Sequence, residues 1–126
     1  MMKNCIALLL TLFLLLVFGC NKEEPVSNIS MQLSQLRVGG LTLNLTDASQ
    51  NIETPVDQPI NGTFTAELDP GSVSSSVTLR IKDGELIPLN VTFLDNGRTF
   101  SALPNETLQP NRQYELIISN QLRGKN

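Results

Sequence analysis

Val91-Thr92-Phe93-Leu94-Asp95-Asn96-Gly97-Arg98-Thr99-Phe100-Ser101-Ala102-Leu103 is the stretch that decides the fold of this chain. Apolar and polar residues alternate on both sides of Asn96-Gly97, as they do in strands that bury one face. Asn-Gly supplies the left-handed backbone conformation that a tight hairpin turn needs. The stretch therefore predicts two antiparallel strands joined by a turn at residues 95–97.

Similar alternating runs fill the chain on both sides of this hairpin. Gly39-Gly40, Asp69-Pro70-Gly71-Ser72 and Asp83-Gly84 separate several of them, and these residue types predict turns. No amphipathic helix of useful length is expected after residue 20. Short strands at roughly ten-residue spacing predict an all-β antiparallel sandwich. The runs are residues 29–38, 41–45, 60–68, 77–82, 89–94, 98–103 and 114–119.

The N-terminal segment has the pattern of an export signal. Lys3 is followed by an apolar run from Ile6 to Phe18 that only Thr11 interrupts. As a helix this run would cover about 20 Å, which is short of the roughly 30 Å hydrocarbon core of a bilayer. Residues 1–19 are therefore predicted to be a signal peptide rather than a transmembrane helix.

Val17-Phe18-Gly19-Cys20 resembles a bacterial lipobox. The resemblance implies cleavage before Cys20, with diacylglycerol on its sulfur and palmitate among the attached acyl chains. Cys5 leaves with the signal, so the folded part has no thiol and no disulfide. Ordinary cleavage nearby, which would leave Cys20 as an unpaired thiol, is the alternative.

Lys22, Glu23 and Glu24 follow the cysteine directly. A short run of lysine and acidic residues at this place resembles the lipoprotein export signal of Bacteroidetes. It implies a lipid-anchored protein of the cell outer membrane that is exposed on the cell surface, and the alternative is a plain solvated linker. Residues 20–29 are predicted to be the lipidated cysteine and a flexible tether, and residues 30–126 the folded domain.

The composition excludes several kinds of active site. The chain has no His and no Trp, so Ser-His-Asp, Cys-His and His-based zinc sites cannot form. Without Lys3 the net charge is −4, from eight basic and twelve acidic residues, and no basic patch suggests nucleic acid. Asp69, Asp83 and Asp95 lie in predicted turns. We therefore expect no catalytic residue, no metal site and no cofactor.

Several motifs in the second half of the chain resemble a bacterial Ig-like domain named after an S-layer protein. They are Val56-Asp57-x-Pro59-Ile60-x-x-x-Phe64, Leu68-Asp69-Pro70-x-x-Val73, Asp95-x-Gly97-x-x-Phe100 and Leu108-x-Pro110-x-x-x-Tyr114. The resemblance covers residues 53–126. It implies an Ig-like antiparallel β-sandwich of about seven strands that acts as a spacer and interaction module without activity of its own.

Such domains continue into a last strand after a segment like Leu122-Arg123-Gly124-Lys125-Asn126. Two alternatives stay open for the place of that strand. Either the hairpin of residues 30–45 fills it, or the chain is the N-terminal part of a longer protein, an exported hydrolase being one case.

Leu108, Pro110 and Tyr114 predict a structural corner. In Ig-like sandwiches a Tyr at the start of a late strand directs its hydroxyl back to backbone a few residues upstream. The contact satisfies a phenol that is otherwise buried.

Three functions are compatible with the sequence. The first is a non-enzymatic, lipid-anchored module whose partners are the membrane, through Cys20, and other domains or surface proteins. The second is a glycan-binding lipoprotein, with polysaccharide as its partner. Sugar sites need exposed aromatic rings, whereas alternation assigns Phe64, Phe93, Phe100 and Tyr114 to the core. The third is the spacer of a longer exported hydrolase.

Overall fold

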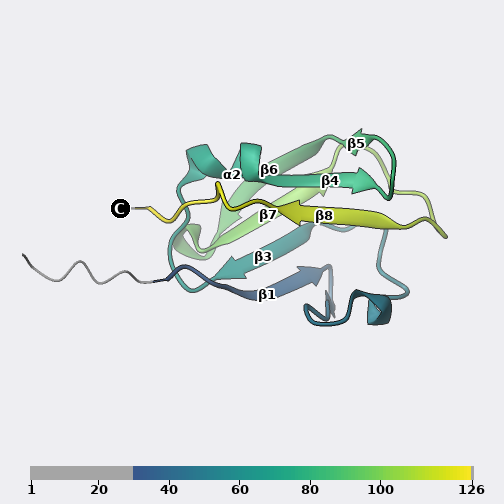
Figure 1. The fold of residues 1–126 in the computed structure, drawn as a ribbon, viewed down its shortest axis with the longest axis horizontal. Coiled ribbons are helices and arrows are strands. Elements are labelled where there is room, and N and C mark those ends of the chain that lie inside the picture. The colour runs from purple at the N-terminus through teal and green to yellow at the C-terminus, as the bar shows by residue number, and fades with distance from the viewer. Residues whose placement is uncertain (1–29, 126) are drawn as a thin grey trace, which may run out of the picture.

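The computed structural model describes residues 30–125, and these residues form two antiparallel sheets (Figure 1). One sheet has the strand order β2-β1-β3-β7-β6, and the other has the order β5-β4-β8. The predicted all-β sandwich is therefore confirmed. In chain order the strands are β1 Leu33–Val38, β2 Leu41–Thr42, β3 Ile60–Phe64, β4 Val77–Ile81, β5 Leu86–Ile87, β6 Leu89–Leu94, β7 Thr99–Pro104 and β8 Tyr114–Ile118.

The hairpin predicted around Asn96-Gly97 is present as β6 and β7. Leu94 pairs with Thr99 and Phe93 with Phe100. The connection is a short 3₁₀ turn, Asp95–Gly97, in which all three residues have positive φ. Asn and Gly tolerate this conformation best among the amino acids, so the local sequence fixes the turn.

The first hairpin, β1–β2, is also present, but its second strand is shorter than predicted. The strand β2 ends at Thr42, whereas alternation extended it to Leu45, which is 51% exposed. The side chain of Asn44 explains the early end, since its Oδ1 accepts hydrogen bonds from the N–H groups of Thr46 (2.9 Å) and Asp47 (3.0 Å). An Asn side chain bonded in this way turns the chain out of a ladder.

Asp69-Pro70-Gly71-Ser72 is not the simple turn that the sequence predicted. It begins the helix α2, Pro70–Ser76. Asp69 caps this helix, because its Oδ1 accepts from the Gly71 N–H at 3.1 Å, and proline is well suited to the first helical position. The prediction was wrong because the helix carries only one large apolar residue, Val73, which is fully buried.

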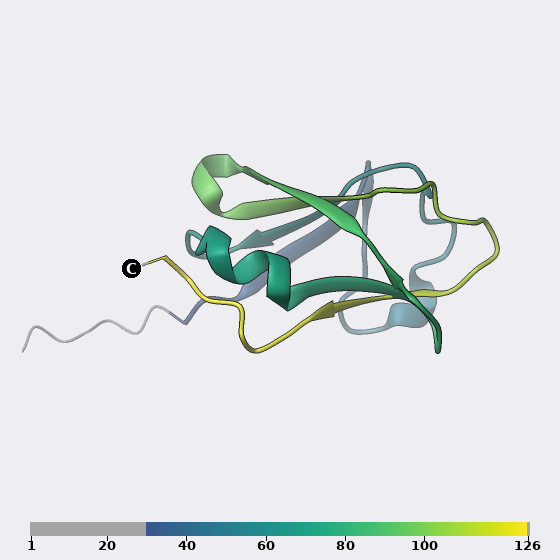
Figure 2. The same cartoon turned by 90° about the horizontal axis from the view of Figure 1, so that it is seen from above.

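The hydrophobic core lies between the two sheets (Figure 2). At its centre Phe64 and Phe100 pack with their ring centroids 6.1 Å apart and their planes tilted by 43°. Half-buried apolar side chains surround this centre, as expected for a domain that relies on burial for its stability. The buried apolar residues are Leu36, Val38, Ile60, Phe64, Leu68, Val73, Val77, Leu79, Phe100, Ala102 and Leu122.

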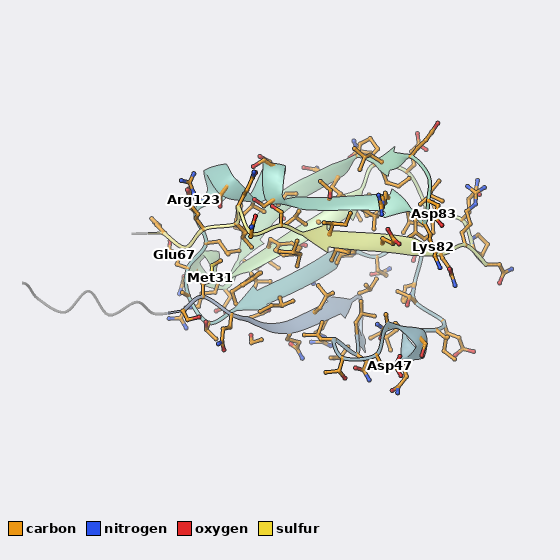
Figure 3. All side chains as sticks on the ribbon, viewed as in Figure 1. Met31, Asp47, Glu67, Lys82, Asp83 and Arg123 are labelled. Atoms are coloured by element: carbon orange, nitrogen blue, oxygen red, sulfur yellow. The ribbon has the colours of Figure 1, made fainter. Side chains whose placement is uncertain are left out.

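The residues after β8 cross to the far side of α2. The Asp69 N–H donates to the Arg123 carbonyl at 2.9 Å, and the Lys125 N–H donates to the Glu67 carbonyl at 2.8 Å. Gly124 also forms a bridge with Leu68. Residues 123–125 are therefore bound to the segment between β3 and α2, at the end of the sandwich where Met31 also lies (Figure 3).

Candidate interaction surfaces

The residues predicted to carry the lipid anchor and the export signal lie outside the described part of the chain. They are Cys20, Lys22, Glu23 and Glu24. Within residues 30–125, no helix has the length and hydropathy to cross a membrane.

The structure brings the three predicted corner residues to one end of β8. The hydroxyl of Tyr114 accepts a hydrogen bond from the Gln109 N–H at 2.7 Å. The neighbouring Leu108 N–H donates to the Val56 carbonyl at 3.0 Å, which joins the corner to the segment before β3. Tyr114 itself is half-buried and packs against the core. The 105–113 segment is thus held from both sides.

The acidic side chains of the described residues serve local structure. Asp47 Oδ1 accepts from the Ser49 hydroxyl (2.6 Å) and N–H (3.1 Å), while its Oδ2 accepts from Gln50 Nε2 (3.0 Å). These hydrogen bonds, the Ser49 hydroxyl first, lower the pKa of the Asp47 carboxyl below its ordinary value. Within residues 30–125 no three His, Cys, Asp or Glu side chains gather where they could hold a metal ion.

Two ion pairs lie on the surface of the described domain. Arg80 and Glu115 approach to 2.6 Å across β4 and β8, and Lys125 and Glu67 approach to 2.8 Å. All four side chains are at least one-third exposed, so each pair contributes little to stability.

The aromatic side chains do not form a platform for a sugar ring. Phe64 and Phe100 are buried, and Phe93 and Tyr114 are half-buried against the core. These are the aromatic residues that the sequence assigned to the interior. A stacking site of the usual kind would need one of the rings on the surface.

An apolar cavity of about 330 Å³ lies between β5 and β6, where the chain changes sheets. Leu86, which is 66% exposed, lies at its rim, and buried Val77 and Leu79 contribute to its wall. The sequence did not point to this cavity, because its walls come from strands of both sheets. The only local signal is Pro88, which separates the two strands. The lining residues are Ser74, Val77, Thr78, Leu79, Leu86, Ile87, Pro88, Leu89 and Val91.

A second surface is the edge of β8. In the described residues this strand pairs with β4 and with no other strand. The two strands differ in burial as a result. Val77 and Leu79 of β4 are each 3% exposed, whereas their partners Ile118 and Leu116 in β8 are only half-buried. Apolar side chains of β8 are thus incompletely covered on the side away from β4.

Comparison with known proteins agrees with this architecture. A family model described as a bacterial Ig-like domain matches residues 41–126, and it begins upstream of the stretch 53–126 that the motifs suggested. No curated protein matches the chain. Two antiparallel sheets around one core, a late strand with a tyrosine corner and a family match over most of the chain agree with one another. The chain belongs to the family of bacterial Ig-like domains.

Proposed function

We propose that the chain is a non-enzymatic, lipid-anchored Ig-like module that spaces or docks other proteins at the surface of a bacterial outer membrane. Membership of the bacterial Ig-like family supports the module. The lipobox-like Val17-Phe18-Gly19-Cys20 and the following Lys22, Glu23 and Glu24 support the anchor and its surface location.

The observation that carries the proposal is the position of the two ends of the sandwich. Met31, close to the predicted tether, lies at one end, and Asp47, Lys82 and Asp83 lie at the other (Figure 3). About ten residues separate Cys20 from the first strand, and they would span at most about 35 Å when extended. A lipid on Cys20 would therefore hold one end near the membrane and direct the loops at the other end outward.

The anchor is tested by labelling with radioactive palmitate in bacterial cells that express the chain. The wild-type chain should incorporate label, and Cys20→Ala should abolish it, because the acyl chains are attached to this residue. Cys5→Ala is the matched control and should keep the label, since Cys5 is removed with the signal. Label that persists in Cys20→Ala would contradict the anchor.

The surface location is tested by treating intact cells with a protease. The wild-type domain should be cleaved or released. Replacement of Lys22, Glu23 and Glu24 by alanine should retain palmitate but protect the domain from the protease. If this triple variant remains as accessible as wild type, these three residues are not an export signal.

Docking of proteins is distinguished from binding of glycans by affinity gel electrophoresis of the whole chain in mild detergent. The proposal expects equal mobility in gels with and without polysaccharide. Retardation by any polysaccharide would instead support the glycan-binding function.

A further inference from the structure

The edge of β8 has the backbone geometry of a strand that lacks one neighbour. The Lys82 N–H donates to the Gln113 carbonyl at 2.9 Å, and the Ser119 N–H donates to the Ser76 carbonyl at 2.8 Å. Bonded pairs alternate along an antiparallel ladder, so Glu115 and Ile117 also direct their polar groups toward β4. The N–H and C=O groups of Tyr114, Leu116 and Ile118 therefore point to the side that no described strand occupies.

The topology shows that this side is normally covered. When the two-residue strands β2 and β5 are set aside, β8 is the sixth principal strand of the sandwich. In an Ig-like sandwich the sixth strand is flanked on one side by the third and on the other by the seventh. Here β4 takes the place of the third strand, and the place of the seventh is empty in residues 30–125.

Neither the first hairpin nor the residues after β8 fill this place. The hairpin β1–β2 lies at the edge of the five-stranded sheet, where β1 pairs with β3. Residues 123–125 are bound to the segment between β3 and α2. Of the two alternatives for the last strand, the one that uses the hairpin of residues 30–45 is therefore wrong.

The edge also lacks the features that prevent strand addition. Proteins usually protect a free edge with lysine, proline or a bulge. The strand Tyr114–Ile118 contains neither lysine nor proline, and its pairing with β4 is regular over all five residues. Its one charged residue, Glu115, is paired with Arg80 at 2.6 Å. An uncharged strand with apolar residues at alternate positions is the complement of this edge.

A second copy of the domain fits the edge poorly. In Figure 1, β3 and β1 of the five-stranded sheet lie on the side of β8 that faces away from β4. Antiparallel pairing of two β8 strands would relate the copies by a two-fold axis perpendicular to the sheet. Each five-stranded sheet would then collide with the other, whereas a single extended segment needs only the ~4.8 Å step beside β8.

We propose that the open edge of β8 accepts an extended strand of a partner protein, which pairs antiparallel with Tyr114–Ile118 and directs alternate apolar side chains toward the core. This mode of recognition is β-strand addition, in which main-chain hydrogen bonds hold the segment. The inference rests on the proposed docking function but does not require the lipid anchor. Its test is carried out in solution, so its failure leaves the Cys20 labelling experiment unaffected.

The test uses the whole chain in mild detergent and the capped peptide Lys-Val-Thr-Val-Thr-Val-Lys as the probe. Without peptide, the amides of Tyr114, Leu116 and Ile118 should exchange with deuterium fast, and those of Glu115, Ile117 and Ser119 slowly. Saturating peptide should slow the first three amides by roughly tenfold or more. Unchanged exchange, or protection of Leu89, Val91 and Phe93 at the β6 edge instead, would overturn the proposal.

A backbone control separates strand addition from hydrophobic adsorption. N-methylation of the peptide amides that face β8 should abolish binding, whereas N-methylation of the alternate amides should leave it intact. On the protein, Leu116→Pro removes an N–H that β4 does not use and should weaken binding at least tenfold more than Leu116→Ala. If Leu116→Pro does not fold, the two methylated peptides still decide. Equal binding of both peptides would overturn strand pairing.

Two further outcomes identify a different occupant. Protection of Tyr114, Leu116 and Ile118 that rises with protein concentration in the absence of peptide would assign the edge to a second copy. Protection that does not depend on concentration would show that the same chain already covers it. Either result overturns the assignment to a partner protein.

Discussion

The ring of Phe100 in β7 occupies the space that a side chain would take on Gly62 of the neighbouring strand β3. The two residues are direct cross-strand partners, and a Cβ atom built on Gly62 would overlap the edge of the ring. Phe100 is fully buried and cannot move outward without opening the core. Glycine at position 62 is therefore required by packing rather than by backbone conformation.

We expect Gly62→Ala to lower the free energy of unfolding by about 1–3 kcal/mol, the usual cost of overpacking a filled core. Urea denaturation followed by circular dichroism measures the change. Gly40→Ala is the control, since no atom lies within 4 Å of a Cβ at that position, and it should be close to neutral. Phe100→Leu should relieve part of the added cost in the double variant. Equal stability of Gly62→Ala and wild type would contradict this packing.

Tyr114→Phe should lower the free energy of unfolding by about 0.5–1.5 kcal/mol, the usual net contribution of one hydrogen bond. The change removes the acceptor of the Gln109 N–H and keeps the ring that packs against the core. Deuterium exchange of the Gln109 amide gives the local readout and should become faster. An unchanged Gln109 exchange rate would mean that the hydroxyl does not hold the corner.

Asp69→Ala should cost about 1 kcal/mol, because it removes the side-chain cap of α2. Asp69→Asn retains an oxygen that can accept from the Gly71 N–H, so most of the stability should remain. Thermal unfolding of the three proteins measures both changes. If the two variants are equally destabilised, the charge of Asp69 matters more than its hydrogen bond.

Asp47 gives the loop at residues 44–51 a dependence on pH. Its pKa is lowered from the ordinary 3.8 by hydrogen bonds from Ser49 and Gln50. A carboxyl with a lowered folded-state pKa stabilises the loop above that ordinary value, and the contribution is lost as the pH falls through the folded-state pKa. The Asp47 carboxyl carbon and the Ser49 amide should therefore titrate together below pH 3.8 in an NMR experiment. Asp47→Asn should remove this transition from the Ser49 amide.

Local sequence predicted most of the strands. Alternation identified the runs that became β1, β3, β4, β6, β7 and β8, because the two faces of a strand differ in burial residue by residue. It missed β5, Leu86–Ile87, which is too short to show a period and is defined by its pairing with Leu79 and Arg80. It also missed α2, whose single buried apolar residue, Val73, gives no helical period.

The candidate surfaces were predictable only in part. Tyr114 stood out because Leu108-x-Pro110-x-x-x-Tyr114 is a local pattern, and its hydroxyl bonds to backbone five residues upstream. The cavity between β5 and β6 left no signal of this kind, since its walls depend on which sheet each strand joins. The open side of β8 likewise appears only once the strand order is known.

The sequence by itself determined which segments are strands and which of their faces are buried, because side-chain alternation and turn residues act over a few neighbouring positions. It also determined the turn at Asn96-Gly97. Only the tertiary structure decided which strands lie side by side, that Phe100 covers Gly62, and that β8 has one unpaired edge. These relationships join residues far apart in the chain, and they result from how the two sheets share one core rather than from any local preference.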